Sequence, residues 1–247
     1  MRLVASGAAE VGQRLILLIA HLGQVVIAQN GLSAQPIFGG PAYFIRNIIY
    51  NTPMHGAIKN GAANPAGVII YHNTFVAENS HARGNSNFHY RNNLTMGTDH
   101  PEKPVFWSVN YTSYATMDYN GYRPNRNGRP QFVWKSPAAG VLREYNLSKM
   151  SNQEYQTLAD FRRGTGQEEH GLELDYDIFV KVRPPDPSNL HAVHESRGVD
   201  FQLRPGTAAV DAGCRLPNVN EDFTGSAPDL GALEVGRPVP VYGPRKP

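Results

Sequence analysis

Three basic residues in the first half of the chain each precede an asparagine in similar surroundings. They are Arg46, His72 and Arg91, and each lies between an apolar run and a β-prone run. If these positions stack in successive repeats, their side chains form a column with the ~4.8 Å spacing of neighbouring strands. Arginine binds a carboxylate through two parallel hydrogen bonds, so this column would suit a polymer that carries carboxylates. The alternative is a set of solvated corner residues paired with neighbouring loops.

Other side chains near this column could transfer protons. Cleavage of a carboxylate-bearing chain by β-elimination needs a group that neutralises the carboxylate, a base for the proton beside it and an acid for the leaving oxygen. Lysine, arginine, histidine and tyrosine can fill such roles. A surface position for the lysine and coil packing for the tyrosines are the structural alternatives. We predict catalytic roles for Lys59, Arg46, His72 and Arg91, and substrate binding by Tyr71, His89, Tyr90 and His55.

Acidic residues offer a different chemistry. Asp175 and Asp177 would share one face of a strand predicted over 172–181, and a glycoside hydrolase needs two carboxylates that flank the scissile bond. A loop with several oxygen ligands could hold Ca²⁺, although turn capping also accounts for its composition. That loop contains Asn220, Glu221, Asp222 and Asp229.

The composition limits the class of protein. The chain has 247 residues with 23 Lys and Arg against 21 Asp and Glu, a balance that argues against a nucleic-acid-binding protein. Its single cysteine, Cys214, excludes an intramolecular disulfide. The 24 glycines, 19 prolines and 10% aromatic residues fit an all-β chain with many turns. The short apolar stretch at 15–20 cannot span a bilayer.

The repeats predict the scaffold. Aligned on Asn47, Asn73 and Asn92, they indicate stacked coils at about 43–63, 66–86 and 87–103, with a fourth at 104–123. The residue two positions after each asparagine is apolar and should face the core, whereas the basic residue should face solvent. Asparagine tolerates the left-handed backbone of a sharp corner and could bond to its equivalents in neighbouring coils. We read Asn120-Gly121 as a turn.

The flanking segments predict a cap and an extension. Residues 1–30 have the periodicity of an amphipathic capping helix, with a signal peptide as the alternative. A capping box at Ser151–Glu154 predicts a helix that ends near Gly164. Residues 201–210 predict two short strands around a turn, and the tail 237–247 is rich in proline and basic residues.

The sequence also resembles a known group, the right-handed parallel β-helix proteins of the pectate-lyase-like and alginate-lyase-like type. The resemblance rests on segments such as Tyr71–Phe75, Tyr90–Asn93 and Asp118–Arg123, and on a closing segment at 201–213 and 227–234. It covers about residues 31–236. With only four coils and without acidic coils before residue 31, the chain looks like the C-terminal portion of a longer solenoid or a shortened member.

These observations predict an all-β chain. We expect a right-handed parallel β-helix over 31–123, an N-terminal cap over 1–30, and an extension with one α-helix over 124–236. The resemblance implies a secreted or periplasmic protein that acts on an anionic polysaccharide, foremost as a lyase that cleaves uronic-acid-containing chains by β-elimination. Lys and Arg commonly act together in lyases of this shape. A non-catalytic carbohydrate-binding or structural solenoid is the alternative, and a glycoside hydrolase the third. We expect a monomer without nucleic-acid partner or membrane span, with Ca²⁺ as an open question.

Overall fold

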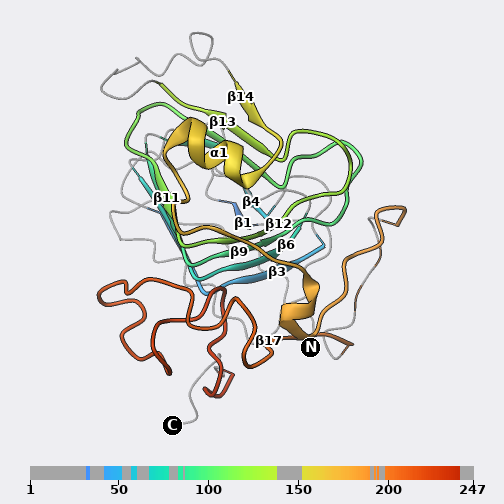
Figure 1. The fold of residues 1–247 in the computed structure, drawn as a ribbon, viewed down its shortest axis with the longest axis vertical. Coiled ribbons are helices and arrows are strands. Elements are labelled where there is room, and N and C mark those ends of the chain that lie inside the picture. The colour runs from blue at the N-terminus through green and yellow to red at the C-terminus, as the bar shows by residue number, and fades with distance from the viewer. Residues whose placement is uncertain are drawn as a thin grey trace, which may run out of the picture.

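The protein is mostly β, with parallel sheets and one α-helix in its described part (Figure 1). A computed structural model describes residues 32–33, 42–51, 57–59, 67–77, 83–85, 87–137, 152–189, 192, 194 and 198–239. The predicted cap at 1–30, the tail beyond 239 and His55 lie outside the described residues. For Lys59 only the backbone, in strand β4, is described.

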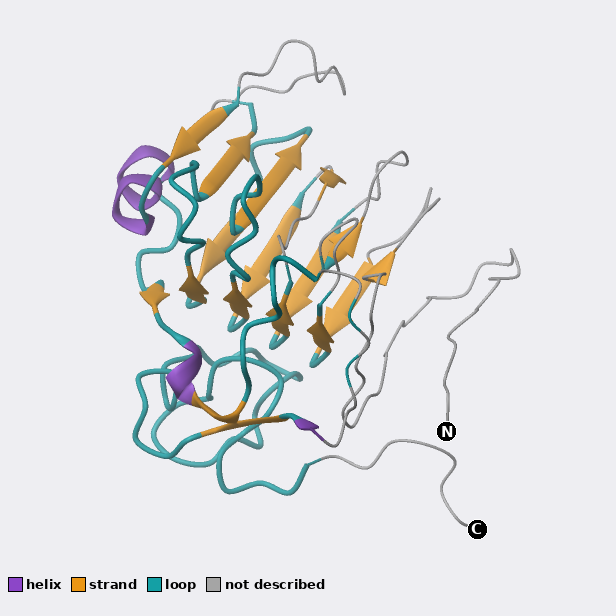
Figure 2. Cartoon of the chain, turned by 90° about the vertical axis from the view of Figure 1, so that its right-hand side faces the viewer, coloured by secondary structure: helices purple, strands orange, loops and turns teal. Residues whose placement is uncertain are grey.

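Two parallel sheets run through the predicted repeats, and each repeat adds one strand to each sheet. The first sheet contains β2 (Ala42–Ile45), β5 (Val68–Tyr71), β8 (Phe88–Arg91) and β11 (Thr116–Asp118). The second contains β3 (Ile48–Tyr50), β6 (Thr74–Val76), β9 (Leu94–Met96), β12 (Gly121–Arg123) and β15 (Leu172–Glu173). Figure 2 shows these strands side by side, so equivalent residues of successive repeats lie in rows across the strands.

The remaining strands form a third sheet of four strands and two separate strand pairs. The third sheet has β7 (Arg83–Asn85), β10 (Phe106–Asn110) and β13 (Phe132–Lys135) in parallel, with β14 (Gln153–Tyr155) antiparallel at its edge. One pair is β1 (Leu32–Ser33) with β4 (Ile58–Lys59), and the other is β16 (Phe179–Lys181) with β17 (Asp200–Leu203).

A ladder of buried asparagines joins the first two sheets at their corner. Each amide Nδ2 donates to the Oδ1 of the next repeat, over 2.8 Å from Asn47 to Asn73, 2.9 Å from Asn73 to Asn93 and 3.0 Å from Asn93 to Asn120. Asn120 then donates to Glu168 over 2.7 Å. The backbone N–H of each asparagine also donates to the next Oδ1, so the ladder satisfies polar groups that the corner would otherwise bury unpaired.

The ladder corrects the alignment of the third repeat. Its corner residue is Asn93 and not Asn92. Asn120 is the fourth member and lies at the corner between β11 and β12, so the chain does change direction there, but Gly121 begins β12. In the first two repeats the left-handed backbone lies one residue earlier than predicted, whereas in the third it lies at Asn92, as predicted. Residues before the ladder positions have φ near +55°, at Arg46 (56°), His72 (53°), Asn92 (57°) and Tyr119 (56°). A shift of one residue exchanges the faces of a strand, so it changes every side-chain assignment in that repeat.

The interior is aromatic and apolar. Phe44, Ile70, Tyr90 and Met117 form one row that points inward from the first sheet. Tyr90 meets Phe106 of the third sheet edge to face, with 5.5 Å between ring centroids. Leu94, predicted to face this interior, instead belongs to the apolar cluster on the other side of the second sheet.

Helix α1 (Leu158–Thr165) covers the end of this interior next to β13 (Figure 2). The Thr157 side chain caps it by accepting from the Asp160 N–H, and Gly166 ends it with φ 68°. Phe161 stacks on Phe132, with 5.0 Å between ring centroids. The predicted helix is thus confirmed, but it begins later than Ser151 because residues 153–155 form strand β14.

The described residues of the C-terminal segment, which spans 176–235, pack on the outer side of the second sheet (Figure 1). Ile48, Leu94 and Met96 of the sheet share an apolar cluster with Phe179, Phe201 and Leu230. The strand predicted over 172–181 is divided into β15 and β16 by a 3-10 helix, η2 (Tyr176–Ile178). The outer side of the second sheet is therefore part of a second core.

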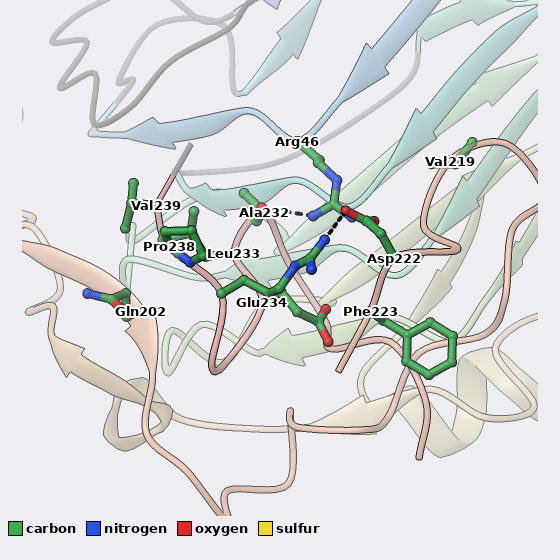
Figure 3. A pocket seen from close by; sticks show the side chains of 11 residues that line it. Arg46, Gln202, Val219, Asp222, Phe223, Ala232, Leu233, Glu234, Pro238 and Val239 are labelled. Atoms are coloured by element: carbon green, nitrogen blue, oxygen red, sulfur yellow. Dashed lines mark hydrogen bonds and ion pairs between the residues drawn. The ribbon is translucent and has the colours of Figure 1, made fainter. Parts of the chain in front are cut away.

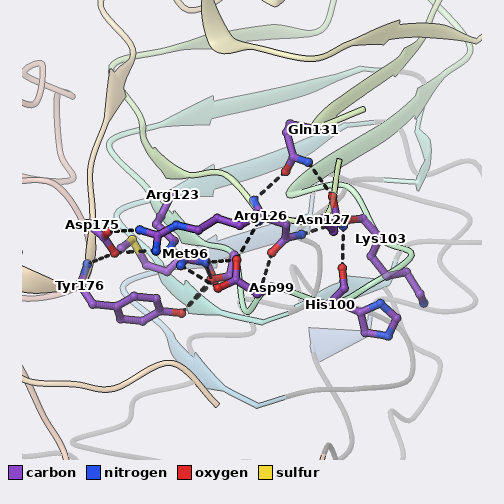
Figure 4. A network of polar contacts seen from close by, with 12 residues as sticks. Met96, Asp99, His100, Lys103, Arg123, Arg126, Asn127, Gln131, Asp175 and Tyr176 are labelled. Carbon is purple, nitrogen blue, oxygen red and sulfur yellow. Dashed lines mark hydrogen bonds and ion pairs between the residues drawn. The ribbon is translucent and has the colours of Figure 1, made fainter. Parts of the chain in front are cut away.

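A buried arginine fastens the loops around η2 (Figure 4). The Arg123 guanidinium donates to both oxygens of Asp99 (2.6 and 2.8 Å), to Gly97 O (2.9 Å) and to Asp175 Oδ1 (3.3 Å). Arg126 donates to the other Asp175 oxygen over 2.8 Å. Asp175 caps η2 and Asp177 lies within that helix, so the predicted carboxylate pair on one strand face is wrong.

Candidate functional site

The side of the first sheet that points away from the interior carries two rows of partly exposed side chains. We call this side the outer face. One row is Tyr43, Ile69, His89 and Thr116; the other is Ile45, Tyr71, Arg91 and Asp118. The rows change in character along the stack. Their first two positions are aliphatic or aromatic, whereas the last two are polar or charged. An extended ligand lying across the strands would therefore meet an apolar part and then a polar part.

Hydrogen bonds organise the polar part of the outer face. The Thr116 hydroxyl contacts His89 Nδ1 over 2.8 Å and accepts from Arg91 Nη2 over 3.1 Å. Arg91 Nη1 also donates to Tyr90 O over 3.2 Å. Burial and the charge of Arg91 lower the pKa of His89 below its usual value. The Arg91 guanidinium is thus held in place at the surface.

An aspartate–histidine pair lies next to Arg91 in the same row. His170 Nδ1 lies 2.9 Å from Asp118 Oδ2, and the backbone N–H of His170 donates to Asp118 Oδ1 over 2.7 Å. Burial would raise the pKa of Asp118, but hydrogen bonds from His170 and Tyr119 outweigh it and hold that pKa below its ordinary value. The Tyr119 ring stacks on the imidazole, with 4.3 Å between centroids. Because Nδ1 donates to the carboxylate, Nε2 of the neutral imidazole keeps its lone pair.

The loop after α1 brings His170 to this position. This loop, residues 166–171, docks on the edge of β11: Glu168 N donates to Met117 O over 2.9 Å, and Met117 N donates to Gln167 Oε1 over 2.7 Å. Arg162 Nε donates to Glu168 O over 2.6 Å, which ties the loop to α1. His170 is therefore positioned by backbone contacts as well as by Asp118.

Glu168 anchors the same loop from inside. Its side chain is fully buried, and its Oε1 accepts from Asn120 Nδ2 and from the Tyr122 hydroxyl, both over 2.7 Å. Burial raises the pKa of Glu168 to about 7, although the hydrogen bonds from Tyr122 and Asn120 oppose the rise. The carboxyl thus occupies the position that an asparagine takes in the other repeats.

Tyr71 and Cys214 lie near Arg91. Tyr71 is the register partner of Arg91, and burial raises the pKa of its hydroxyl despite the nearby guanidinium. The Cys214 thiol is partly buried, and burial raises its pKa as well. Both groups therefore keep their protons at neutral pH.

The structure brings three predicted site residues together on the outer face: Arg91, His89 and Tyr71. Tyr90 alternates with them and points inward, where it is fully buried, bonds to Thr95 Oγ1 over 2.7 Å and packs on Phe75. The prediction that Tyr90 binds substrate is therefore wrong.

His72 is also buried, so its predicted solvent-facing position is wrong. It is 1% exposed, with Nδ1 3.2 Å from Gly231 O and Nε2 3.0 and 2.7 Å from the amides of Asn92 and Asn220. The carbonyl must accept and the amides must donate, so this imidazole is neutral with its proton on Nδ1. Burial and the charge of Arg46 lower the pKa of His72 to about 3.

Arg46 points to a different place from Arg91. Its Nη1 donates to Ala232 O over 3.4 Å, and its side chain lines a cavity of about 540 Å³ beside the C-terminal segment (Figure 3). The predicted single column of Arg46, His72 and Arg91 is therefore wrong. The first two precede ladder asparagines, but Arg91 lies two positions before Asn93.

The described residues contain no group of three or more His, Cys, Asp or Glu side chains that could hold a metal ion. In the loop considered for Ca²⁺, Asn220 donates to His72 and Asp229 accepts from the backbone N–H groups of Asp211 and Val235. Within the same part of the chain, no helix is long and apolar enough to cross a membrane.

Comparisons of the chain with protein families, curated proteins and solved structures find no match. The candidate site is therefore defined by its geometry. Sequence reasoning missed Asp118, Tyr119 and His170. Asp118 could have been found, because it precedes Asn120 by two positions, as Arg91 precedes Asn93.

Proposed function

We propose that the stacked repeats form a right-handed parallel β-helix whose outer face binds an anionic polysaccharide and cleaves it by β-elimination. The fold proposal is supported by the parallel sheets, the repeated register and the ladder along their corner. A polysaccharide of this kind lies outside the cell, so a secreted or periplasmic location is part of the proposal.

The observation that supports the reaction best is the position of Arg91 next to Asp118 and His170 on an accessible sheet face. Register partners on neighbouring strands are ~4.8 Å apart, a spacing similar to the length of one sugar unit. A chain lying across the strands would meet Tyr71, Arg91 and Asp118 in turn. A sugar carboxylate would thus lie on Arg91, close to the imidazole of His170.

The roles follow from the chemistry of each group. Arg91 pairs with the uronate carboxylate and stabilises the negative charge that develops when C5 loses its proton. His170 Nε2 takes that proton, and Asp118 stabilises the imidazolium that forms. The electron pair of the C5–H bond becomes the C4–C5 double bond as the C4–O4 bond breaks. Tyr71, whose hydroxyl remains protonated, gives its proton to the leaving oxygen.

The test is incubation of the protein with alginate, pectate and chondroitin, with and without Ca²⁺, and with neutral dextran as the control. Ultraviolet absorbance of the unsaturated product should rise with at least one polyanion and not with dextran. Arg91→Gln should weaken both binding and turnover, because the carboxylate loses its cation. No product from any of the three polyanions would refute the lyase proposal, and binding without product would instead indicate a carbohydrate-binding protein.

A further inference from the structure

A cavity of about 540 Å³ lies between the corner that joins β2 to β3 and the C-terminal segment (Figure 3). Arg46, Asp222, Glu234 and Arg237 contribute charged groups to its lining, and Leu233 and Pro238 contribute apolar surface. Its volume lies in the range of small-molecule sites in proteins. The proposed polysaccharide reaction does not use this cavity.

Arg46 differs from its equivalents in the other repeats. At the same corner position, His72 bonds to Gly231 O and Asn220, and Asn92 exchanges hydrogen bonds with the backbone of Cys214. The C-terminal segment thus supplies partners at these two levels. At the Arg46 level it supplies one hydrogen bond of 3.4 Å from Nη1 to Ala232 O. A guanidinium has five N–H donors, so most of those on Arg46 lack a partner among the described residues.

The nearby carboxylates are engaged with other groups. Asp222 pairs with Arg237, and the two oxygens of Glu234 accept from the backbone N–H groups of Thr224 and Asp229. Both carboxylates lie near enough to interact electrostatically with Arg46, but in the described part of the chain neither forms an ion pair with it at contact distance. A partly buried guanidinium whose only printed hydrogen bond goes to one carbonyl favours an anion that can accept two hydrogen bonds from its remaining donors.

We propose that this cavity binds a small organic carboxylate, with the carboxylate on Arg46 and the apolar part of the ligand against Leu233 and Pro238. The proposal is independent of the lyase reaction, because the cavity and the outer face are lined by different side chains. A sugar acid and a simple cyclic carboxylate share the required chemistry, and the experiment separates them.

The experiment is an NMR titration of the full chain with glucuronate, cyclohexanecarboxylate and, as the neutral match, glucose. At least one carboxylate should shift the Val219 and Leu233 methyl resonances, whereas glucose should not. Tighter binding of glucuronate would indicate that the cavity prefers a sugar acid, and tighter binding of cyclohexanecarboxylate would indicate that it prefers a hydrocarbon ring. Arg46→Asn should weaken the binding about 10-fold or more, because hydrogen bonds to a charged group are lost. Asparagine suits the left-handed backbone here, as Asn92 does two repeats later.

Arg91→Gln is the matched control, because it removes an arginine of the outer face and should leave the Val219 and Leu233 shifts intact. The proposal is overturned if glucose causes the same shifts as the carboxylates, if neither carboxylate shifts them, or if Arg46→Asn binds as tightly as the original chain. The comparison of glucuronate with glucose remains decisive if Arg46→Asn does not fold. None of these readouts depends on turnover, so failure of the lyase proposal would be seen separately.

Discussion

Two neighbouring residues at the end of β11, Asp118 and Tyr119, orient His170. The Asp118 carboxylate holds Nδ1, and the Tyr119 ring covers one side of the imidazole. This arrangement directs the basic Nε2 away from the carboxylate, as in other histidines that are oriented by an acidic group. The side chain of His170 is half exposed, so the base is accessible to a large substrate.

The buried carboxyl of Glu168 predicts a pH dependence of stability. Its pKa in the folded protein, about 7, lies above the ordinary value of 4.5. The stabilisation is therefore fully present below pH 4.5 and is lost as the pH rises through 7. The difference corresponds to about 3 kcal/mol. In Glu168→Gln this loss should be absent, and urea denaturation at a series of pH values measures it.

Glu169→Gln is the control for this prediction, because Glu169 is an exposed glutamate one position along. Its free energy of unfolding should follow that of the original chain across the pH range. Equal pH profiles for Glu168→Gln and the original chain would contradict the role of the buried carboxyl.

At the scale of elements, the asparagine ladder holds the first two sheets in register. Each internal member donates from Nδ2 both to the next asparagine and to a backbone carbonyl, and accepts from two donors of the previous repeat. These side chains are almost fully buried. Removing one leaves several polar groups unpaired in an environment without water, and this cost exceeds the loss of a single hydrogen bond.

Asn93→Ala should therefore lower the free energy of unfolding by about 3 kcal/mol. Asn152→Ala, an exposed position before β14, should change it by less than about 0.5 kcal/mol. Denaturant titrations of both variants measure the difference. If the two variants were equally stable, the ladder would not contribute as described.

The elements also show what the sequence could predict. The alignment of Asn47 with Asn73 and the existence of α1 were predictable, because strong local patterns carry them. The predicted alignment of the third repeat was wrong by one residue because Arg91-Asn92-Asn93 contains two asparagines. Only the hydrogen bond from Asn73 to Asn93 distinguishes them. That shift by one residue placed Arg91 in a column with His72, although the two side chains occupy different surroundings.

At the scale of the whole molecule, the C-terminal segment covers the second sheet, whereas the outer face of the first sheet keeps partly exposed side chains. This difference could not be predicted from the repeats, because they supply similar strands to both sheets. His170 could not be predicted either, since it lies 52 residues from Asp118 and meets it only through the docking of a loop.

His72 connects the repeats to the C-terminal segment and predicts an effect of acid. Its pKa in the folded protein, about 3, lies below the ordinary value of 6.5. The stabilisation is therefore fully present above pH 6.5 and is lost as the pH falls through 3, by about 5 kcal/mol in all. Amide hydrogen exchange in residues 209–232 should accelerate as the pH falls, after correction for the intrinsic pH dependence of exchange.

His72→Asn provides the comparison, because asparagine occupies the same corner position at Asn92. The variant should be less stable at neutral pH, since it loses the contact with Gly231 O, but it should lack the titration in acid. An acid transition of the same size in the variant would show that another group is responsible.

The most direct test of the proposed function compares product formation by His170→Gln and Glu169→Gln on the polyuronate that the original chain cleaves best. His170→Gln should reduce kcat about 10²- to 10⁴-fold with little change in substrate binding, because the base is lost while Arg91 remains. Glu169→Gln should match the original chain. Equal rates of unsaturated product formation by His170→Gln and the original chain would contradict the account.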